Sequence, residues 1–230
     1  MPSVLISGTY PTREQLADEA KTLVVDSQPK ELHVSACPFS QAAKSSSPVL
    51  RYSATQEDER MRQALKHLQT THQGFRTGDY AQSFNWAQIS AEYRRLRESN
   101  SHGHLPGRLS DSTEDGGGEG LTWYAVVFRS KRRADCNSVD LFAADKEAYE
   151  EAYAHTNGAL LVYWYSDLDE NNDCLATCVW TGRDIARSVN ALPAHRQAAR
   201  LSAGAYVHYH IDRYRIQWLA DEQQLSLAPW

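Results

Sequence analysis

The sequence predicts an α+β fold in which one antiparallel sheet carries two helices on one side and follows a helical N-terminal arm. Three observations favour this fold. The C-terminal half alternates β-rich runs with helical periodicities in the order β-α-β-β-α-β. Residues 121–230 hold 15 of the 23 aromatic residues, which places most of the core there. Residues 99–120 hold six of the 12 glycines and no aromatic residue, a composition typical of a flexible linker.

The first strand and helix of the C-terminal half follow from β-propensity and periodicity. Residues 121–128 (LTWYAVVF) are rich in β-branched and aromatic residues and precede a basic turn at 131–133. Leu141, Ala144, Ala148 and Ala152 then recur at helical spacing. Asp140 is a candidate N-cap, and Asn157-Gly158 supplies residues that tolerate the left-handed stop.

A hairpin, a second helix and a last strand complete the order. Residues 159–165 (ALLVYWY) and 175–180 (LATCVW) flank a polar tip, which predicts an antiparallel hairpin. Thr181 and Asp184 have the spacing of a capping box before a helix that is interrupted near Pro193 and runs to about residue 205. Residues 207–219 alternate as a final strand, and the whole order is that of the ferredoxin-like split β-α-β arrangement.

The N-terminal half predicts an arm rather than a second core. We expect a strand at 32–38 and two amphipathic helices, at 57–69 and 86–97. Each predicted helix has one apolar stripe, but the N-terminal half offers little other apolar surface against which that stripe could be buried. The predicted organisation is therefore an arm at 1–98 that packs on the core, a linker at 99–120 and a domain at 121–230.

A sheet with both helices on one face leaves its other face apolar. A few hundred Å² of such surface is worth several kcal/mol at about 25 cal/mol per Å². We therefore expect a homodimer through the helix-free face, with the arm covering the apolar surface that remains.

Composition and charge exclude several classes of protein. The chain has 230 residues, of which 41% are hydrophobic, and a formal charge of −5, which disfavours broad nucleic-acid binding. No apolar run approaches the roughly 18 residues of a membrane span, and the N-terminus lacks the pattern of a signal peptide. Four cysteines without a glycosylation sequon favour a reducing compartment, so we expect a cytoplasmic protein.

Several motifs carry a resemblance to known proteins. Trp180 is followed by Arg183-Asp184-Ile185-Ala186 and then by Pro193 and His195. In this order the region from Trp123 to Trp230 resembles the dimeric α/β-barrel superfamily, which includes antibiotic-biosynthesis monooxygenases, haem-degrading enzymes, polyketide cyclases and lactone isomerases. The wider pattern (LLVYWY, LATCVW, RLSAGAYVHYHIDRYR and the terminal Pro-Trp) is similar to an uncharacterised fungal protein family.

The resemblance implies a small-molecule enzyme of secondary metabolism that works on a hydrophobic or aromatic compound. It would be a cyclase, an isomerase or a cofactor-independent, monooxygenase-like enzyme. The alternative is a non-catalytic ligand-binding or assembly protein on the same fold. Because Val189-Asn190 stands where haem-degrading members carry their axial histidine, haem ligation is not implied, and we expect no cofactor.

The candidate site combines one histidine with aromatic residues. His195 near a helix start could exchange protons at neutral pH, or simply bond to backbone there. Tyr163 and Tyr165 could polarise substrate oxygens, whereas Trp164 points to the opposite face of the same strand. The predicted catalytic residues are His195, Tyr163 and Tyr165, and the predicted substrate-binding residues are Trp164, Trp180, Tyr206 and Tyr209.

The last strand carries a second pattern, with His208, His210 and Asp212 alternating on one face. His-x-His on a strand is a metal-ligand spacing, but no third and fourth ligand can be assigned. We therefore expect polar or dimer-facing residues there and no metal.

Overall fold

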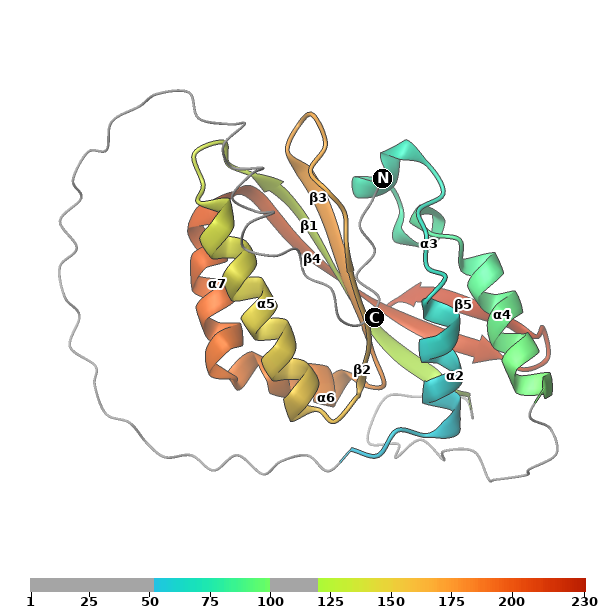
Figure 1. Ribbon diagram of the computed structural model, residues 1–230. Helices are drawn as coiled ribbons and strands as arrows, with labels where there is room; N and C mark the ends of the chain where they lie inside the picture. The colour runs from blue at the N-terminus through green and yellow to red at the C-terminus, as the bar shows by residue number, and fades with distance from the viewer. Residues whose placement is uncertain (1–51, 100–119) are drawn as a thin grey trace.

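A computed structural model of the chain describes residues 52–99 and 120–230, and the strand predicted at 32–38 lies outside them. Five antiparallel strands form one sheet in the order β2-β3-β1-β4-β5 (Figure 1). Their bounds are β1 Thr122–Arg132, β2 Leu160–Tyr165, β3 Asp173–Trp180, β4 Tyr206–Leu219 and β5 Gln224–Pro229. The first four strands and the two helical segments between them have the ferredoxin-like topology, so the predicted fold class is confirmed.

Two of these strands differ from the prediction. β1 continues through the predicted basic turn, because Lys131 pairs with Asp173 of β3 and Arg132 with Tyr206 of β4. β5 was not predicted. It follows a turn in which Gln223 takes a positive φ of 53°, and it pairs along the second half of β4.

Helices α5 (Ser138–His155), α6 (Arg183–Ser188) and α7 (Pro193–Ala205) cover one face of the sheet (Figure 1). Asn137, rather than Asp140, caps α5 by accepting a hydrogen bond from the Asp140 N–H. Asn157 and Gly158 end it with φ angles of 47° and 84°, as predicted. The capping box predicted before α6 is wrong: Gly182 is the N-cap and makes no side-chain cap.

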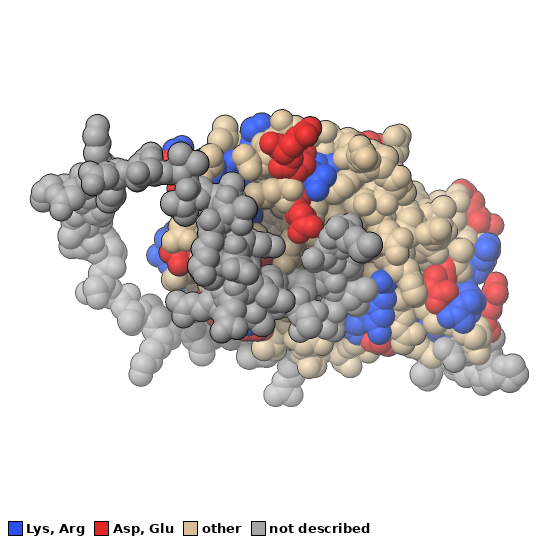
Figure 2. Space-filling view, turned by 45° about the horizontal axis from the view of Figure 1, so that its top comes forward, with Lys and Arg blue, Asp and Glu red and all other residues tan. Residues whose placement is uncertain are grey.

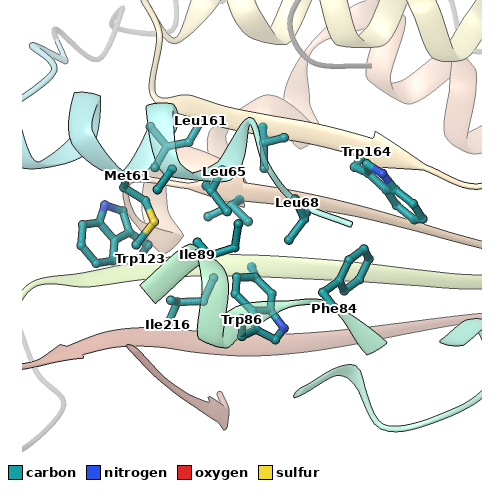
Figure 3. Close-up of a cluster of buried hydrophobic side chains, with 14 of the residues drawn as sticks. Met61, Leu65, Leu68, Phe84, Trp86, Ile89, Trp123, Leu161, Trp164 and Ile216 are labelled. Carbon is teal, nitrogen blue, oxygen red and sulfur yellow. The ribbon is translucent and has the colours of Figure 1, made fainter. Parts of the chain in front are cut away.

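The other face of the sheet is covered by the N-terminal helices. These are α2 (Gln56–Leu65), the 3₁₀ turn η1 (Gln73–Arg76), α3 (Tyr80–Ser83) and α4 (Trp86–Ser99). Thr55 and Asp58 form a capping box at the start of α2. Figure 3 shows the side chains of α2 and α4 meeting those of the strands in one apolar layer. The arm and the sheet therefore share a single core, and the face expected to form a dimer interface is occupied by the chain's own helices.

Buried polar contacts fix the position of the arm on the sheet. The carboxylate of Asp58, only 2% exposed, accepts hydrogen bonds from Trp123 Nε1 at 3.1 Å and from the Thr55 N–H at 3.0 Å. On the same side of the sheet, the Arg129 guanidinium donates to the carbonyl oxygens of Arg76 (2.6 Å) and Gly78 (2.7 Å) and pairs with Asp212 (3.1 Å). These contacts tie α2 to the start of β1 and the η1 segment to its second half.

The face of the molecule drawn in Figure 2 has no large patch of one charge. Basic and acidic side chains are interspersed on it. No helix within the described residues is long and apolar enough to cross a membrane.

Candidate functional site

A carboxylate and a tyrosine meet between α5 and the sheet. The hydroxyl of Tyr163, in the middle of β2, lies 2.9 Å from both carboxylate oxygens of Asp145 on α5 and donates to them. Tyr163 points to the helix side because strand residues alternate, and Asp145 faces it because it lies one turn after the buried Leu141. Both side chains are only partly buried. The pair can therefore meet a ligand from solvent.

Four further tyrosines extend this pair into what we call the tyrosine cluster, which comprises Tyr149, Tyr163, Tyr165, Tyr206 and Tyr209. Tyr149 of α5 stacks on Tyr163 with ring centroids 5.8 Å apart, and Tyr165 lies 6.1 Å from the same ring. At the start of β4, Tyr206 and Tyr209 stack at 5.2 Å. One group of rings lies on α5 and β2 and the other on β4, and both are close enough to Asp145 for its charge to affect the pKa of Tyr206 and Tyr209.

Burial keeps three phenols of the cluster, those of Tyr149, Tyr206 and Tyr209, protonated at neutral pH by raising their pKa. Desolvation raises the pKa of Tyr206 to about 12, an effect that nearby Arg132 opposes and the Asp145 carboxylate reinforces. Desolvation likewise raises the pKa of Tyr209. At neutral pH these groups are hydrogen-bond donors, while Asp145 is the acidic group beside them. The arrangement can polarise a ligand oxygen and accept a proton.

His195 lies elsewhere, on the first turn of α7 against α5. Burial lowers its pKa, while the backbone of Ala148 and the charge of Glu151 act in the opposite direction. Its Nδ1 is buried and has no hydrogen-bond partner among the described residues. The neutral imidazole therefore packs between two helices rather than among the tyrosine hydroxyls.

A surface groove of about 390 Å³ lies beside His195, between α5 and α7. It is lined by Glu147, Glu151, Pro193, Ala194, Arg196, Gln197 and Arg200. Glu151 accepts a hydrogen bond from the Ala194 N–H at 2.9 Å and so holds the start of α7. The mixture of charges is unlike the apolar pocket expected for a hydrophobic substrate.

The two tryptophans predicted to bind substrate have different surroundings. Trp164 is fully buried on the arm side, where the rings of Phe75 and Phe84 lie 6.0 and 4.9 Å away, so it cannot share a site with Tyr163. Trp180 lies on the helix side but is only 3% exposed, and its Nε1 donates to Cys178 Sγ at 3.0 Å. Both tryptophans are core residues here.

The histidines of β4 form a short polar chain on the arm side. Nε2 of His210 lies 2.8 Å from Asp212 Oδ1, and the second oxygen of Asp212 pairs with Arg129. Residues 52–99 and 120–230 contain no group of three or more His, Cys, Asp or Glu side chains that could hold a metal ion.

Sequence reasoning missed Asp145 and Arg132. An acidic residue on a helix is usually solvated, but Asp145 lies four residues after Leu141 and next to Ala144, on the stripe predicted to be buried. The Arg132 side chain, in a residue only 8% exposed, covers the Phe142 ring at 4.7 Å. No pattern in the sequence distinguishes it from the solvated Arg133 beside it.

Comparison with known proteins places the chain in a family. Residues 40–229 match the PB2B2.08-like family. The chain belongs to this family. It is similar to the UPF0643 protein PB2B2.08 of Schizosaccharomyces pombe (strain 972 / ATCC 24843), with 29% identity over 144 residues that cover 60% of the chain and 58% of the relative. The predicted membership of a fungal family is confirmed, and the similarity spans little more than half the length of this relative.

Two solved structures show a weak similarity to this chain. A dimeric protein of unknown function with a ferredoxin-like fold from Bacteroides fragilis NCTC 9343 is 13% identical, with a TM-score of 0.31 over 40% of this chain and 94% of that one. A candidate monooxygenase from Lactobacillus acidophilus NCFM is 8% identical, with a TM-score of 0.37 over 49% of this chain and 55% of that one.

Proposed function

We propose that the chain is a small-molecule enzyme that moves a proton on a flat, hydrophobic carbonyl compound. The observation that carries this proposal is the Tyr163 hydroxyl held by both carboxylate oxygens of Asp145 at 2.9 Å, within the tyrosine cluster. Aldol-type cyclisation and isomerisation of a carbonyl compound both begin with removal of a proton next to the carbonyl, a step that general base catalysis accelerates.

The proposed reaction uses Asp145 as the base. Its carboxylate removes a proton from the carbon next to the substrate carbonyl, and the C–H electron pair moves to form an enolate. The Tyr163 hydroxyl then donates its hydrogen bond to the enolate oxygen instead of to Asp145. In a substrate whose enolate is conjugated with a C=C bond, Asp145 returns the proton to the far carbon of that system, which completes an isomerisation. In a substrate with a second carbonyl, the enolate carbon attacks that carbonyl carbon, its C=O π electrons move to the oxygen, and the alkoxide takes the proton from Asp145, which completes a cyclisation.

The other residues predicted for the site take supporting roles in this proposal. Tyr165, Tyr206 and Tyr209 supply aromatic surface and further hydroxyl donors for the substrate. His195 stays a candidate proton donor or acceptor, although its neighbours Ala148 and Glu151 belong to the interface of α5 and α7. Trp164 has no part in the reaction.

Hydrogen–deuterium exchange of 2-tetralone in D₂O tests the proposal. This flat aromatic ketone has acidic protons next to its carbonyl, and NMR follows their loss directly. We expect the wild-type chain to accelerate the exchange, and Asp145→Asn and Tyr163→Phe each to lower the rate by about a hundredfold. Tyr153→Phe is the matched control, because Tyr153 lies on α5 and is 45% exposed.

Equal rates in wild type, Asp145→Asn and Tyr153→Phe would contradict catalysis by Asp145. The non-catalytic alternative predicts a different pattern. In that case 1-naphthol quenches the protein's fluorescence and Tyr163→Phe weakens this binding, but neither the wild type nor any variant accelerates the exchange.

We also propose a cytoplasmic location, supported by the free thiols of Cys136, Cys174 and Cys178. A fluorescent fusion expressed in fungal cells tests it. The predicted homodimer is likewise retained as a proposal, but through a surface other than the sheet face that the arm covers.

A further inference from the structure

Arg132, at the end of β1, is a buried arginine without a carboxylate partner. The residue is only 8% exposed, and no carboxylate of the described residues forms an ion pair with it. Arg60, which is buried to a similar degree, pairs with Glu57 at 2.6 Å. The half-buried Arg129 likewise pairs with Asp212. The guanidinium of Arg132 therefore carries a charge that the described part of the chain does not neutralise.

The polar contacts of Arg132 do not replace this partner. A guanidinium can donate several hydrogen bonds at once. Nη1 of Arg132 lies at the long distance of 3.4 Å from Ser138 Oγ, and its Nε is buried with no hydrogen-bond partner among the described residues. The Phe142 ring, 4.7 Å from Cζ, adds a cation–π contact. Arginine keeps its proton at any physiological pH, and an unpaired buried charge is costly, so a bound anion would remove a cost that the fold bears.

Arg132 lies at one end of the tyrosine cluster, where β1 meets the start of α5 (Figure 1). The Phe142 ring that it covers has its centroid 6.3 Å from that of Tyr165. Burial raises the pKa of Tyr206, and the charge of Arg132 opposes this rise, so the two groups are neighbours. Asp145 follows Phe142 by three residues, which is about 4.5 Å along the helix axis. A ligand of one or two rings can therefore extend from the guanidinium to the Asp145 carboxylate.

We propose that Arg132 binds the carboxylate group of the small aromatic molecule that the tyrosine cluster holds. The planar guanidinium donates two parallel hydrogen bonds to a carboxylate, which suits this group better than a neutral one. The carboxylate lies at Arg132, and the ring of the molecule lies beside Phe142 and Tyr165. The ketone then reaches Tyr163 and Asp145. That this molecule is the substrate rests on the proposed function, and the substrate is then an aromatic keto acid.

Isothermal titration calorimetry of the full chain with two ligands of one shape tests the site. The 6-carboxylate of 2-tetralone carries the negative charge, and the 6-carboxamide has the same shape without it. We expect wild type to bind the carboxylate about tenfold more tightly than the amide. Arg132→Met should abolish this preference by weakening carboxylate binding, with amide binding unchanged within about twofold. Arg133→Met is the matched control and keeps the preference, because this neighbouring side chain is exposed and pairs with Asp135.

Three results overturn the proposal. They are a wild type that does not bind the carboxylate, equal affinities of wild type for the two ligands, and a preference for the carboxylate that survives in Arg132→Met. If Arg132→Met does not fold, Arg132→Lys replaces it. Lysine keeps the charge but loses the planar fork, so the preference should fall by about threefold, and an unchanged preference in this variant overturns the proposal as well.

Proton exchange in D₂O separates this proposal from the proposed function. If wild type prefers the carboxylate, and Arg132→Met loses that preference, while no ligand exchanges its protons faster, the carboxylate site stands and the proposed reaction fails. If wild type accelerates exchange in 2-tetralone and in its 6-carboxylate equally, and binds the carboxylate and the amide equally, the reaction stands and the role of Arg132 fails.

Discussion

Replacement of Trp164 by alanine should be among the most destabilising single changes in this protein. The side chain is fully buried between β2 and the arm, with the rings of Phe75 and Phe84 against it. A buried tryptophan removes about 150–250 Å² from water, and its truncation in a core costs about 3–5 kcal/mol. Because Trp164 Nε1 has no hydrogen-bond partner among the described residues, the loss should come from packing alone.

Urea denaturation followed by far-UV circular dichroism measures this loss directly. We expect a lower midpoint with an unchanged slope and a melting temperature reduced by about 10 °C. Trp230→Ala is the control: this tryptophan is 38% exposed and rests on Arg215, so its loss should cost less than about 1.5 kcal/mol. A cost below about 1 kcal/mol for Trp164→Ala, or equal costs in both variants, would refute the assignment of Trp164 to the shared core.

Three further predictions concern polar residues. Asp58→Ala removes the acceptor of the Trp123 indole and should lower the unfolding free energy by about 3–5 kcal/mol in urea titrations, whereas a loss within 0.5 kcal/mol would contradict the role of this carboxylate. Arg129→Met should speed amide exchange in residues 75–79, while Arg133→Met, whose side chain is exposed, should leave it unchanged. Burial lowers the pKa of His195, so the unfolded chain binds that proton more readily and stability should fall as the pH drops below about 6.5. The pH dependence between 7.5 and 5.5 should be smaller in His195→Gln, and an identical dependence in both proteins would contradict this.

Most of the fold can be predicted from the sequence because the local patterns agree with the tertiary structure. Tyr163 and Trp164 alternate on β2, and the structure does send them to opposite faces. The helical stripe from Leu141 to Ala152 is buried as its spacing predicts. β5 escaped prediction because only Leu225 and Leu227 alternate in it, and two apolar residues do not distinguish a strand from a loop.

The candidate site is less predictable, since it depends on distances between elements. Its chemistry makes His195 a candidate proton donor or acceptor. Where its side chain points, however, depends on how α7 packs on α5, and the sequence does not show that packing. Asp145 could not be identified from the sequence, because its hydrogen bond with Tyr163 joins two residues that lie 18 positions apart on different elements, α5 and β2. The sequence does not show whether Trp164 lines a pocket or the core, because aromatic residues occur in both. The arm, which packs over Trp164 in the structure, makes it a core residue.

The shared core has a consequence for synthesis of the chain on the ribosome. Tyr93 of α4 packs against the Trp218 ring with centroids 5.0 Å apart, so an early helix waits for a strand made more than a hundred residues later. Until then the apolar side of α4 lacks β4 and β5, on which it packs, whereas α2 can already lie on β1 and β2. Such long-range closure slows folding and leaves nascent chains prone to aggregate. A ribosome stalled before β4 would therefore leave the apolar side of α4 exposed, which is the kind of surface that chaperones hold.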